Sequence, residues 1–347
     1  MSTTSQQGFR QRARLPMRRL GDGLCVSAIG FGAMGMSEFY GPSDDDASRT
    51  LLREVVEHGV TMIDTADMYG RGHNELLIGG LLKSAASLRR GGELKIATKC
   101  GIERSGGPTA PRRINNTPAY IRSACEGSLE RLGVERIDLY YIHRVDPEAD
   151  IEETMGCLAE LVKEGKIAHV GLCEVSASTL ERAHRVHPVA ALQSEYSLWS
   201  RDVEKDILPM VRKLGIGFVA YSPLGRGFLS GRLTSTADLS EGDFRRGNPR
   251  FEEHNLSHNL RLLDSIRDIA DDHKATVGQV ALAWLLAKGP DIVPIPGTRR
   301  SAFLQENLGA SSVDLSPADL ALLDRSWPAS EIRGERYGES GMRGINA

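Results

Sequence analysis

Short apolar runs rich in β-branched residues alternate with longer segments of helical periodicity along most of this chain. A strand that is followed by a helix and then by another strand is typical of a parallel βαβ unit. The chain contains eight strand candidates of this kind, at 28–32, 61–65, 94–99, 137–143, 167–172, 190–195, 217–222 and 292–296. Eight such units predict an α/β fold closed into a (β/α)8 barrel, the TIM barrel.

The segments between the strand candidates carry apolar residues at intervals of three and four, which predicts helices with one buried face. In 117–132 these residues are Ile121, Ala124, Cys125, Leu129 and Leu132, and in 151–162 they are Ile151, Met155, Leu158 and Val162. The segment 44–57 opens with three aspartates, which suit a helix N-terminus. Ahead of the first unit, MRRLGDGLCVSAIG has an Asp22-Gly23 turn signal and predicts an N-terminal β-hairpin.

The domain organisation follows from where the alternation of strand and helix candidates continues and where it is interrupted. We expect one barrel domain over 17–330, because barrels of this length routinely form a single domain. Residues 1–16 are polar and basic without an apolar stretch, and predict a flexible tail rather than an export signal. Two glycine- and arginine-rich segments, 225–255 and 331–347, have no clear period, and long loops in compact domains are usually functional or disordered. The tail 331–347 is either a plain extension or a segment that folds over the barrel mouth.

Composition and charge exclude several classes of function. The formal net charge of -3 argues against a dedicated nucleic-acid binder. No apolar run approaches the ~18 residues of a membrane span. The five cysteines are odd in number and never form a CxxC pair, which favours free thiols in a reducing cytoplasm over a disulfide framework or a zinc site. Whether the protein is a monomer or a homo-oligomer stays open.

Titratable residues gather where the strand candidates end, and the active site of a barrel is assembled at that end. Asp64 and Tyr69 follow the second candidate, Lys99 closes the third, and His143 closes the fourth. An ammonium beside a phenol lowers the pKa of the phenol, and a buried ammonium needs a counter-charge such as Asp64. A neighbouring histidine can orient a carbonyl oxygen or relay a proton. Because this set contains no activated nucleophile, it suits protonation of an oxygen while a cofactor delivers a hydride.

Several long motifs then identify a resemblance. DTADMYG, IATKCG, DLYYIHRVDP, EGKIAHVGLCEVS, LQSEYSLWSR, AYSPLGRGFLSG and IPGTRRSAFLQENLGA occur in this order. They resemble the characteristic segments of the aldo-keto reductase superfamily over about residues 18 to 325. The chain is most similar to the bacterial and plant branch that is related to the potassium-channel β subunits.

The resemblance implies a function and a set of site residues. It implies NADPH-dependent reduction of an aldehyde or ketone, with Tyr69 as general acid, Lys99 and Asp64 as the pair that tunes its pKa, and His143 as the partner that orients the carbonyl. It also implies NADP(H) across the barrel mouth. The nicotinamide end would meet Ala33, Met34, Cys173, Glu174, Gln193 and Tyr221, the pyrophosphate Ser222, Pro223, Leu224, Gly225 and Arg226, and the adenosine end Gly297, Arg299, Glu306 and Asn307.

Two departures from the family pattern bear on cofactor binding. Cys173 stands where the family commonly has serine, which weakens the expected contact with the carboxamide. Phe303 stands where relatives often carry a polar or basic residue near the adenosine phosphate. Arg299 and Arg300 offer compensating charge, because a guanidinium forms a planar fork that suits a phosphate. We therefore expect NADP in preference to NAD.

Other interpretations of the same segments stay open. GFGAMG at 30–35 is a literal GxGxxG, but Gly41-Pro42 follow where a dinucleotide-binding helix would run, so a barrel strand and loop are favoured. Met34, Phe39 and Tyr40 either wall a substrate pocket or pack within their loop. His73 and Glu75 are weak evidence for a metal site and a metal-dependent hydrolase. The arginines of 243–251 either face solvent or close over a phosphate. A cofactor-binding regulatory subunit with little turnover is the alternative function.

Overall fold

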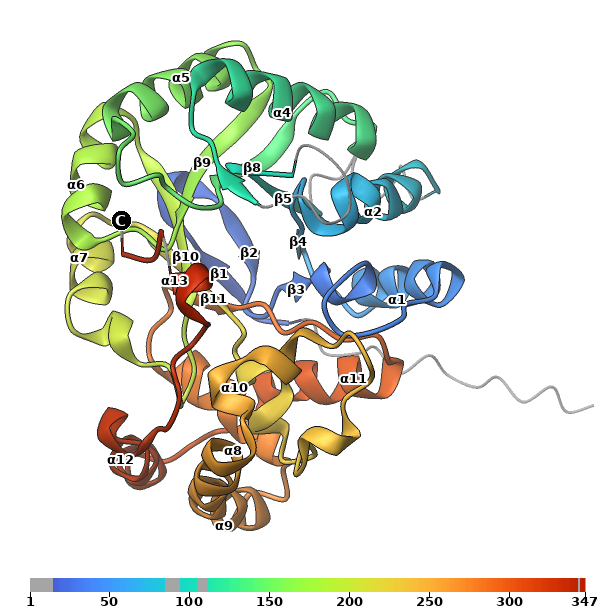
Figure 1. The fold of residues 1–347 in the computed structure, drawn as a ribbon, viewed down its shortest axis with the longest axis vertical. Helices are drawn as coiled ribbons and strands as arrows, with labels where there is room; N and C mark the ends of the chain where they lie inside the picture. The colour runs from blue at the N-terminus through green and yellow to red at the C-terminus, as the bar shows by residue number, and fades with distance from the viewer. Residues whose placement is uncertain (1–14, 85–93, 105–111, 343, 347) are drawn as a thin grey trace, which may run out of the picture.

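The computed structural model describes residues 15–84, 94–104, 112–342 and 344–346 of the 347-residue chain, so most of the expected tail 1–16 lies outside the described residues. Eight parallel strands form one sheet in the order β12-β11-β10-β9-β8-β5-β4-β3. The strands are β3 (Phe31–Gly32), β4 (Met62–Asp64), β5 (Lys95–Cys100), β8 (Ile137–Ile142), β9 (Ile167–Cys173), β10 (Val189–Glu195), β11 (Gly217–Tyr221) and β12 (Ile292–Pro294). Figure 1 shows them surrounded by helices.

The two edge strands of this sheet meet and close the barrel. The backbone N–H of Gly30 donates to Pro294 O at 3.0 Å, and that of Gly32 donates to Pro296 O at 3.5 Å. A side chain at Gly32 would place its Cβ 2.8 Å from Ile295 O, so this close approach requires glycine. The predicted (β/α)8 barrel is therefore confirmed, and the GFGAMG segment is a barrel strand and its loop.

The helices are α1 (Asp45–Glu57), α2 (His73–Ser84), α4 (Pro118–Leu132), α5 (Ile151–Lys163), α6 (Ala177–Val186), α7 (Ile207–Lys213), α8 (Glu253–Asn259), α9 (Asp264–Asp272), α10 (Val277–Ala287), α11 (Ser301–Gly309), α12 (Pro317–Ser326) and α13 (Glu339–Met342). Local sequence explains their beginnings. The Asp44 side chain accepts from Ala47 N at 2.7 Å and caps α1, and Pro118 at the first position of α4 needs no hydrogen-bond partner. Among the described residues no helix is long and apolar enough to span a membrane.

Two apolar regions stabilise the barrel. The larger one lies between the strands and the surrounding helices, and it contains the buried faces expected for α4 and α5. The smaller one fills the barrel interior with side chains such as Met62, Leu139 and Val219. The N-terminal hairpin of β1 (Met17–Arg19) and β2 (Cys25–Ser27) closes this interior from below with Leu20 and Leu24, beside the first residues of β10 and β11.

Loops and the tail build up the opposite face, where the strands end. The loop after β11 forms short 3-10 turns, among them Gly225–Ser230 and Phe244–Gly247, before α8. A small antiparallel pair, β6 (Ile102–Glu103) and β7 (Arg113–Ile114), follows β5. Figure 1 shows α13, near the end of the chain, beside the ends of β10 and β11. The backbone N–H of Asn346 donates to Glu174 O at 2.7 Å, which ties the tail to the end of β9.

Candidate active site

The four residues expected to carry the chemistry come together at the ends of β4, β5 and β8. The Lys99 ammonium donates to the Asp64 carboxylate and, at 2.8 Å, to Thr65 O. The same ammonium lies 5.3 Å from the centre of the Tyr69 ring. The Tyr69 and His143 rings meet edge to face with centroids 5.8 Å apart. All four side chains are buried, and Tyr69 and His143 open onto a cavity.

Burial sets the net pKa of the phenol. Burial raises the pKa of Tyr69 to about 12, although the Lys99 charge lowers it and the Asp64 charge raises it. The expected influence of Lys99 thus has the right sign, but the expectation of a net lowered pKa is wrong, because desolvation of the phenolate outweighs the ammonium. Burial alone would lower the pKa of Lys99, yet the charge of Asp64 and its hydrogen bond raise it above the usual value. Lys99 is therefore a charged ammonium next to a protonated phenol.

His143 is a neutral imidazole in this setting. Burial, followed by the charges of Lys99, Arg144 and Arg112, lowers the pKa of His143 well below its usual range. Its Nδ1 is buried and has no hydrogen-bond partner among the described residues. A neutral histidine beside a protonated phenol can share a hydrogen bond with a carbonyl oxygen without adding a charge.

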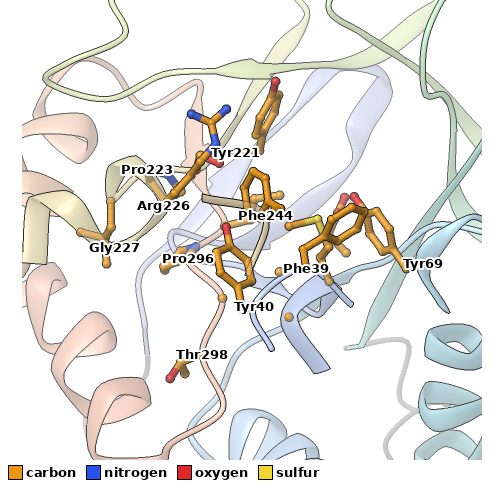
Figure 2. A pocket seen from close by; sticks show the side chains of 18 of the residues that line it. Phe39, Tyr40, Tyr69, Tyr221, Pro223, Arg226, Gly227, Phe244, Pro296 and Thr298 are labelled. Carbon is orange, nitrogen blue, oxygen red and sulfur yellow. The ribbon is translucent and has the colours of Figure 1, made fainter. Parts of the chain in front are cut away.

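A cavity of about 800 Å³ runs from this group across the barrel mouth, which is within the size range of cofactor pockets. Of the expected cofactor residues, those that line it are Met34, Gln193, Tyr221, Ser222, Pro223, Leu224, Arg226, Gly297 and Arg299. Phe39 and Tyr40 line it as well, as the pocket-wall interpretation expected. Figure 2 shows Phe39 beside Tyr69 and, farther along, Tyr221 and Arg226.

The segment after β11 is a tight turn with an unusual backbone conformation. Ser222, Gly225, Arg226 and Gly227 all have positive φ, at 48°, 55°, 57° and 93°. The N–H groups of Gly225 and Gly227 donate within the segment, to Ser222 O at 2.8 Å and to Leu224 O at 3.0 Å. Non-glycine residues in this region are strained, and strain of this kind clusters at functional sites. Ser222, Pro223, Leu224 and Arg226 of this turn line the cavity, and their contact with a pyrophosphate stays a prediction.

The far end of the cavity is basic and carries one aromatic ring. Phe303 lies between two guanidinium groups, with Arg232 4.5 Å and Arg300 5.3 Å from its ring centre. Arg299 donates to the carbonyl oxygens of Tyr40, at 2.8 Å, and of Pro42. The arginines at this end can meet a phosphate.

Six expected cofactor residues lie behind the cavity wall, so their part in binding stays a prediction. They are Ala33, Cys173, Glu174, Gly225, Glu306 and Asn307. The Cys173 side chain is inside the barrel, where burial raises the pKa of its thiol to about 12. Glu306 pairs with Arg232 at 2.6 Å. The Gln193 side chain reaches the cavity and donates to Asp64 Oδ2 at 2.7 Å.

A second buried charge cluster joins the tail to the strand ends. We define this arginine cluster as Glu174, Glu195, Arg226, Arg250 and Arg336. Arg336 pairs with both glutamates, and Arg226 and Arg250 pair with Glu195 at 2.7 Å and 3.6 Å. Three arginines outweigh burial and lower the pKa of Glu195 to about 2. The cluster holds the tail segment around residue 336 over the barrel mouth.

The arginine cluster places Tyr337 in the cavity wall. Its hydroxyl lies 3.0 Å from the Tyr221 hydroxyl, and Arg226 stacks on its ring at 4.6 Å. Across the cavity, the backbone N–H of Phe244 donates to Phe39 O at 3.0 Å and joins the loop after β11 to the loop after β3. The interpretation in which the tail folds over the mouth thus matches the contacts of Arg336 and Tyr337.

Several alternatives from the sequence find other partners. Arg245 pairs with Asp243 at 2.6 Å and Arg246 donates to Ser240 O at 3.0 Å, within their own loop. Arg245 also lines the cavity, so closure over a phosphate stays a prediction. His73 contacts Ser37 and Asp45 rather than the cavity. Glu75 is buried against Thr98 and Arg131. Among the described residues no group of three or more His, Cys, Asp or Glu is placed to hold a metal ion.

Sequence reasoning missed two arginines. Arg112 and Arg144 line the cavity near Tyr69 and His143. Arg144 stands next to His143 in the YIHRVDP motif, which is a signal that places it at a strand end. Arg112 follows the Gly- and Pro-containing sequence SGGPTAP, and no local sequence pattern indicates that its side chain lines the cavity.

A closed barrel that brings an aspartate, a lysine, a tyrosine and a histidine to one end of a long cavity is the arrangement of an oxidoreductase that acts on carbonyl groups. Residues 28–328 match the Aldo/keto reductase family, and the chain belongs to this family, whose members generally use NAD(P)H.

Relatives support the same assignment. A probable aldo-keto reductase 1 of Glycine max is 43% identical over 328 residues, which cover 94% of this chain and 93% of that protein. The thermostable aldo-keto reductase Tm1743, solved with the inhibitor epalrestat, is 32% identical with a TM-score of 0.71 and covers 90% of this chain and 100% of that one. The glycerol dehydrogenase AKR11B4 of Gluconobacter oxydans is 28% identical with a TM-score of 0.79 and covers 89% and 94%.

Proposed function

We propose that this protein is an NADPH-dependent reductase of aldehydes or ketones in which Tyr69 is the general acid. The observation that carries the proposal is the placement of Tyr69 and His143 at the end of the cavity, with Lys99 and Asp64 buried behind the phenol. Membership of the aldo/keto reductase family supports the class of reaction. Five free cysteines, four of them buried, support a cytoplasmic location.

The cavity fits a dinucleotide phosphate along its length. Tyr221 would flank the nicotinamide, the left-handed segment from Ser222 would hold the pyrophosphate, and Arg299 and Arg300 would meet the 2′-phosphate. When bound, NADPH would supply the hydride that reduces the carbonyl carbon. The preference for NADPH over NADH rests on the two arginines, because only NADP carries the 2′-phosphate.

The protonation states assign the roles of the side chains. Because the pKa of Tyr69 is about 12, its hydroxyl is protonated at neutral pH and can give its proton to the developing alkoxide. Lys99 lowers the pKa of the phenol and therefore stabilises the tyrosinate that remains. The neutral His143 can hydrogen-bond the carbonyl oxygen from a second direction. Asp64 keeps the buried ammonium charged.

The test is Tyr69→Phe, assayed with NADPH and NADH in parallel on a panel of aldehydes and ketones. Phe keeps the ring but removes the proton donor, so kcat should fall by about 10²- to 10⁴-fold while cofactor affinity, measured by fluorescence titration, stays near that of the wild type. Full activity in this variant contradicts the role of Tyr69. A wild-type protein that binds NADPH but turns over no carbonyl points instead to the regulatory subunit.

A further inference from the structure

The substrate end of the cavity contains two arginines without a carboxylate partner. Seven arginines line the cavity, and three of them, Arg226, Arg232 and Arg245, pair with carboxylates. Arg299 and Arg300 lie at the adenosine end, on backbone carbonyls and on Phe303. The remaining two, Arg112 and Arg144, form no ion pair with any described residue, and both lie at the end occupied by Tyr69 and His143.

Arg112 is held by an aromatic ring. Its guanidinium lies 5.1 Å from the ring centre of Phe39, and the Phe39 ring meets that of Tyr69 edge to face at 6.4 Å. The charges of Arg104 and Glu38 both act on Arg112, and these two residues pair with each other at 2.7 Å. The positive charge of Arg112 is thus left without a close counter-charge beside the proposed proton donor.

Arg144 lines the same cavity and follows β8. It follows His143 directly, and its guanidinium donates to His143 O at 2.8 Å. Asn116 donates to Arg144 O at 3.0 Å and fixes the backbone. Glu174 and the tyrosines 221 and 337 act on it electrostatically, but Glu174 forms its ion pair with Arg336.

Positive charges therefore outnumber negative charges among the side chains that act on His143 at this end of the cavity. The charges of Lys99, Arg144 and Arg112 all lower the pKa of His143, and His143, Arg144 and Arg112 line the same cavity. Only Lys99 has its own carboxylate, Asp64. Arg112 is exposed and Arg144 is half-buried, and both side chains line the cavity, where an anionic ligand can meet their guanidinium groups.

We propose that the natural substrate is an oxo acid, a carbonyl compound whose carboxylate is received by Arg112 and Arg144. The proposal rests on the reductase function proposed above and names the substrate class of the same site. An arginine fork binds a carboxylate with charge-assisted hydrogen bonds, while Met34, Phe39 and Ile102 provide an apolar wall for the carbon skeleton. The carboxylate sets the position of the carbonyl against Tyr69 and His143.

The experiment compares 4-carboxybenzaldehyde with 4-carbamoylbenzaldehyde, which have similar sizes and differ in charge. We measure kcat/KM for both with NADPH in the wild type, Arg112→Gln, Arg144→Gln and the control Arg53→Gln, an exposed position on α1. The wild type should prefer the carboxylate by about 10- to 100-fold, mainly through KM, because a hydrogen-bonded ion pair is worth that factor. Arg112→Gln and Arg144→Gln should each lower the preference about tenfold, and Arg53→Gln should keep it.

A wild-type preference of one or less overturns the proposal, as does an unchanged preference in both pocket variants. A thermal shift measured on the wild type decides the matter without turnover or variants. 4-(Hydroxymethyl)benzoate should raise Tm more than 4-(hydroxymethyl)benzamide, and equal shifts overturn the proposal. If neither aldehyde is reduced while the benzoate still gives the larger shift, the reductase function fails and the carboxylate site stands.

Discussion

Two buried charge clusters lie at the same end of the barrel and differ in how fully they are paired. In the first, Lys99 is paired with Asp64, and the phenol of Tyr69 beside them faces the cavity. In the second, the arginine cluster, three arginines surround two glutamates and hold the tail. The first leaves groups available to a ligand, whereas in the second every charge has a partner within the chain.

The difference shows how to distinguish buried charges that take part in catalysis from buried charges that stabilise the fold. Both clusters perturb pKa values strongly, so perturbation alone does not identify a catalytic group. What distinguishes the first cluster is that Tyr69 and His143 border the cavity, and that His143 Nδ1 is buried without a partner among the described residues. The arginine cluster binds segments of the chain to one another, and its effect should appear in stability rather than in rate.

The largest expected effect is a loss of reaction rate when the first cluster is changed. Lys99→Met removes the ammonium that lowers the pKa of Tyr69, so the tyrosinate formed during reduction loses its stabilising charge. We expect kcat to fall by about 10²- to 10⁴-fold in a carbonyl reduction assay. Circular dichroism checks that the variant is folded, because Asp64 is left buried without its partner. A kcat within tenfold of the wild type would show that Lys99 is not needed for proton transfer.

The next effect concerns stability. Arg336→Met leaves Glu174 buried without its arginine, and an unpaired buried charge costs about 3–5 kcal/mol. Chemical denaturation should report this loss of unfolding free energy. Arg333→Met, at an exposed position on the same tail, is the matched control and should change stability by less than about 0.5 kcal/mol. Equal stabilities of the two variants would mean that the tail does not depend on the arginine cluster.

Acid should weaken the arginine cluster through Glu195. Its pKa is lowered to about 2 in the folded chain, against ~4.3 for an unperturbed glutamate. A lowered folded-state pKa contributes stability that is present above ~4.3 and is lost as the pH falls toward 2. The Tm of the wild type should therefore fall over this window, and Glu195→Gln should show a shallower fall. Parallel Tm curves for the two proteins would contradict the assigned pKa.

The smallest expected effect is a gain of stability at high pH, and it concerns Asp67. This residue lies near Tyr69 in sequence and forms no ion pair with any described residue. Burial, followed by the charge of Glu75, raises the pKa of Asp67 to about 7. Stability tied to a raised pKa is present below ~3.9 and is lost as the pH rises through 7. Asp67→Asn should thus stabilise the protein by about 1–3 kcal/mol at pH 8 and have little effect near pH 4. A uniform effect across this range would count against the shift.

Most of the fold could be predicted from local sequence patterns. Barrel strand β4 ends in Asp64 and β5 ends one residue after Lys99, where the apolar runs stop. The capping side chain of Asp44 and the N-terminal position of Pro118 mark two helix beginnings. The same logic brought Asp64, Tyr69, Lys99 and His143 together, since residues at the ends of parallel strands share one face of the barrel.

The remainder of the site depends on contacts that leave no local pattern. Arg336 reaches Glu174 across 162 positions of the chain, and neither segment indicates the other. Arg112 contacts Phe39 because two loops pack together, and loop packing leaves no periodic pattern in the sequence. The net pKa of Tyr69 depends on how deeply the phenol is buried, and the sequence around Tyr69 does not give that depth.

The tail has a consequence for protein engineering. Tyr337 completes a wall that begins at Tyr221, and Arg336 anchors that wall to Glu174 and Glu195. A chimera that takes its barrel from one relative and its last segment from another would bring together halves of the wall with different shapes and charges. Recombination within this family should therefore exchange 221–226 and 333–346 as one block, even though more than a hundred residues separate them.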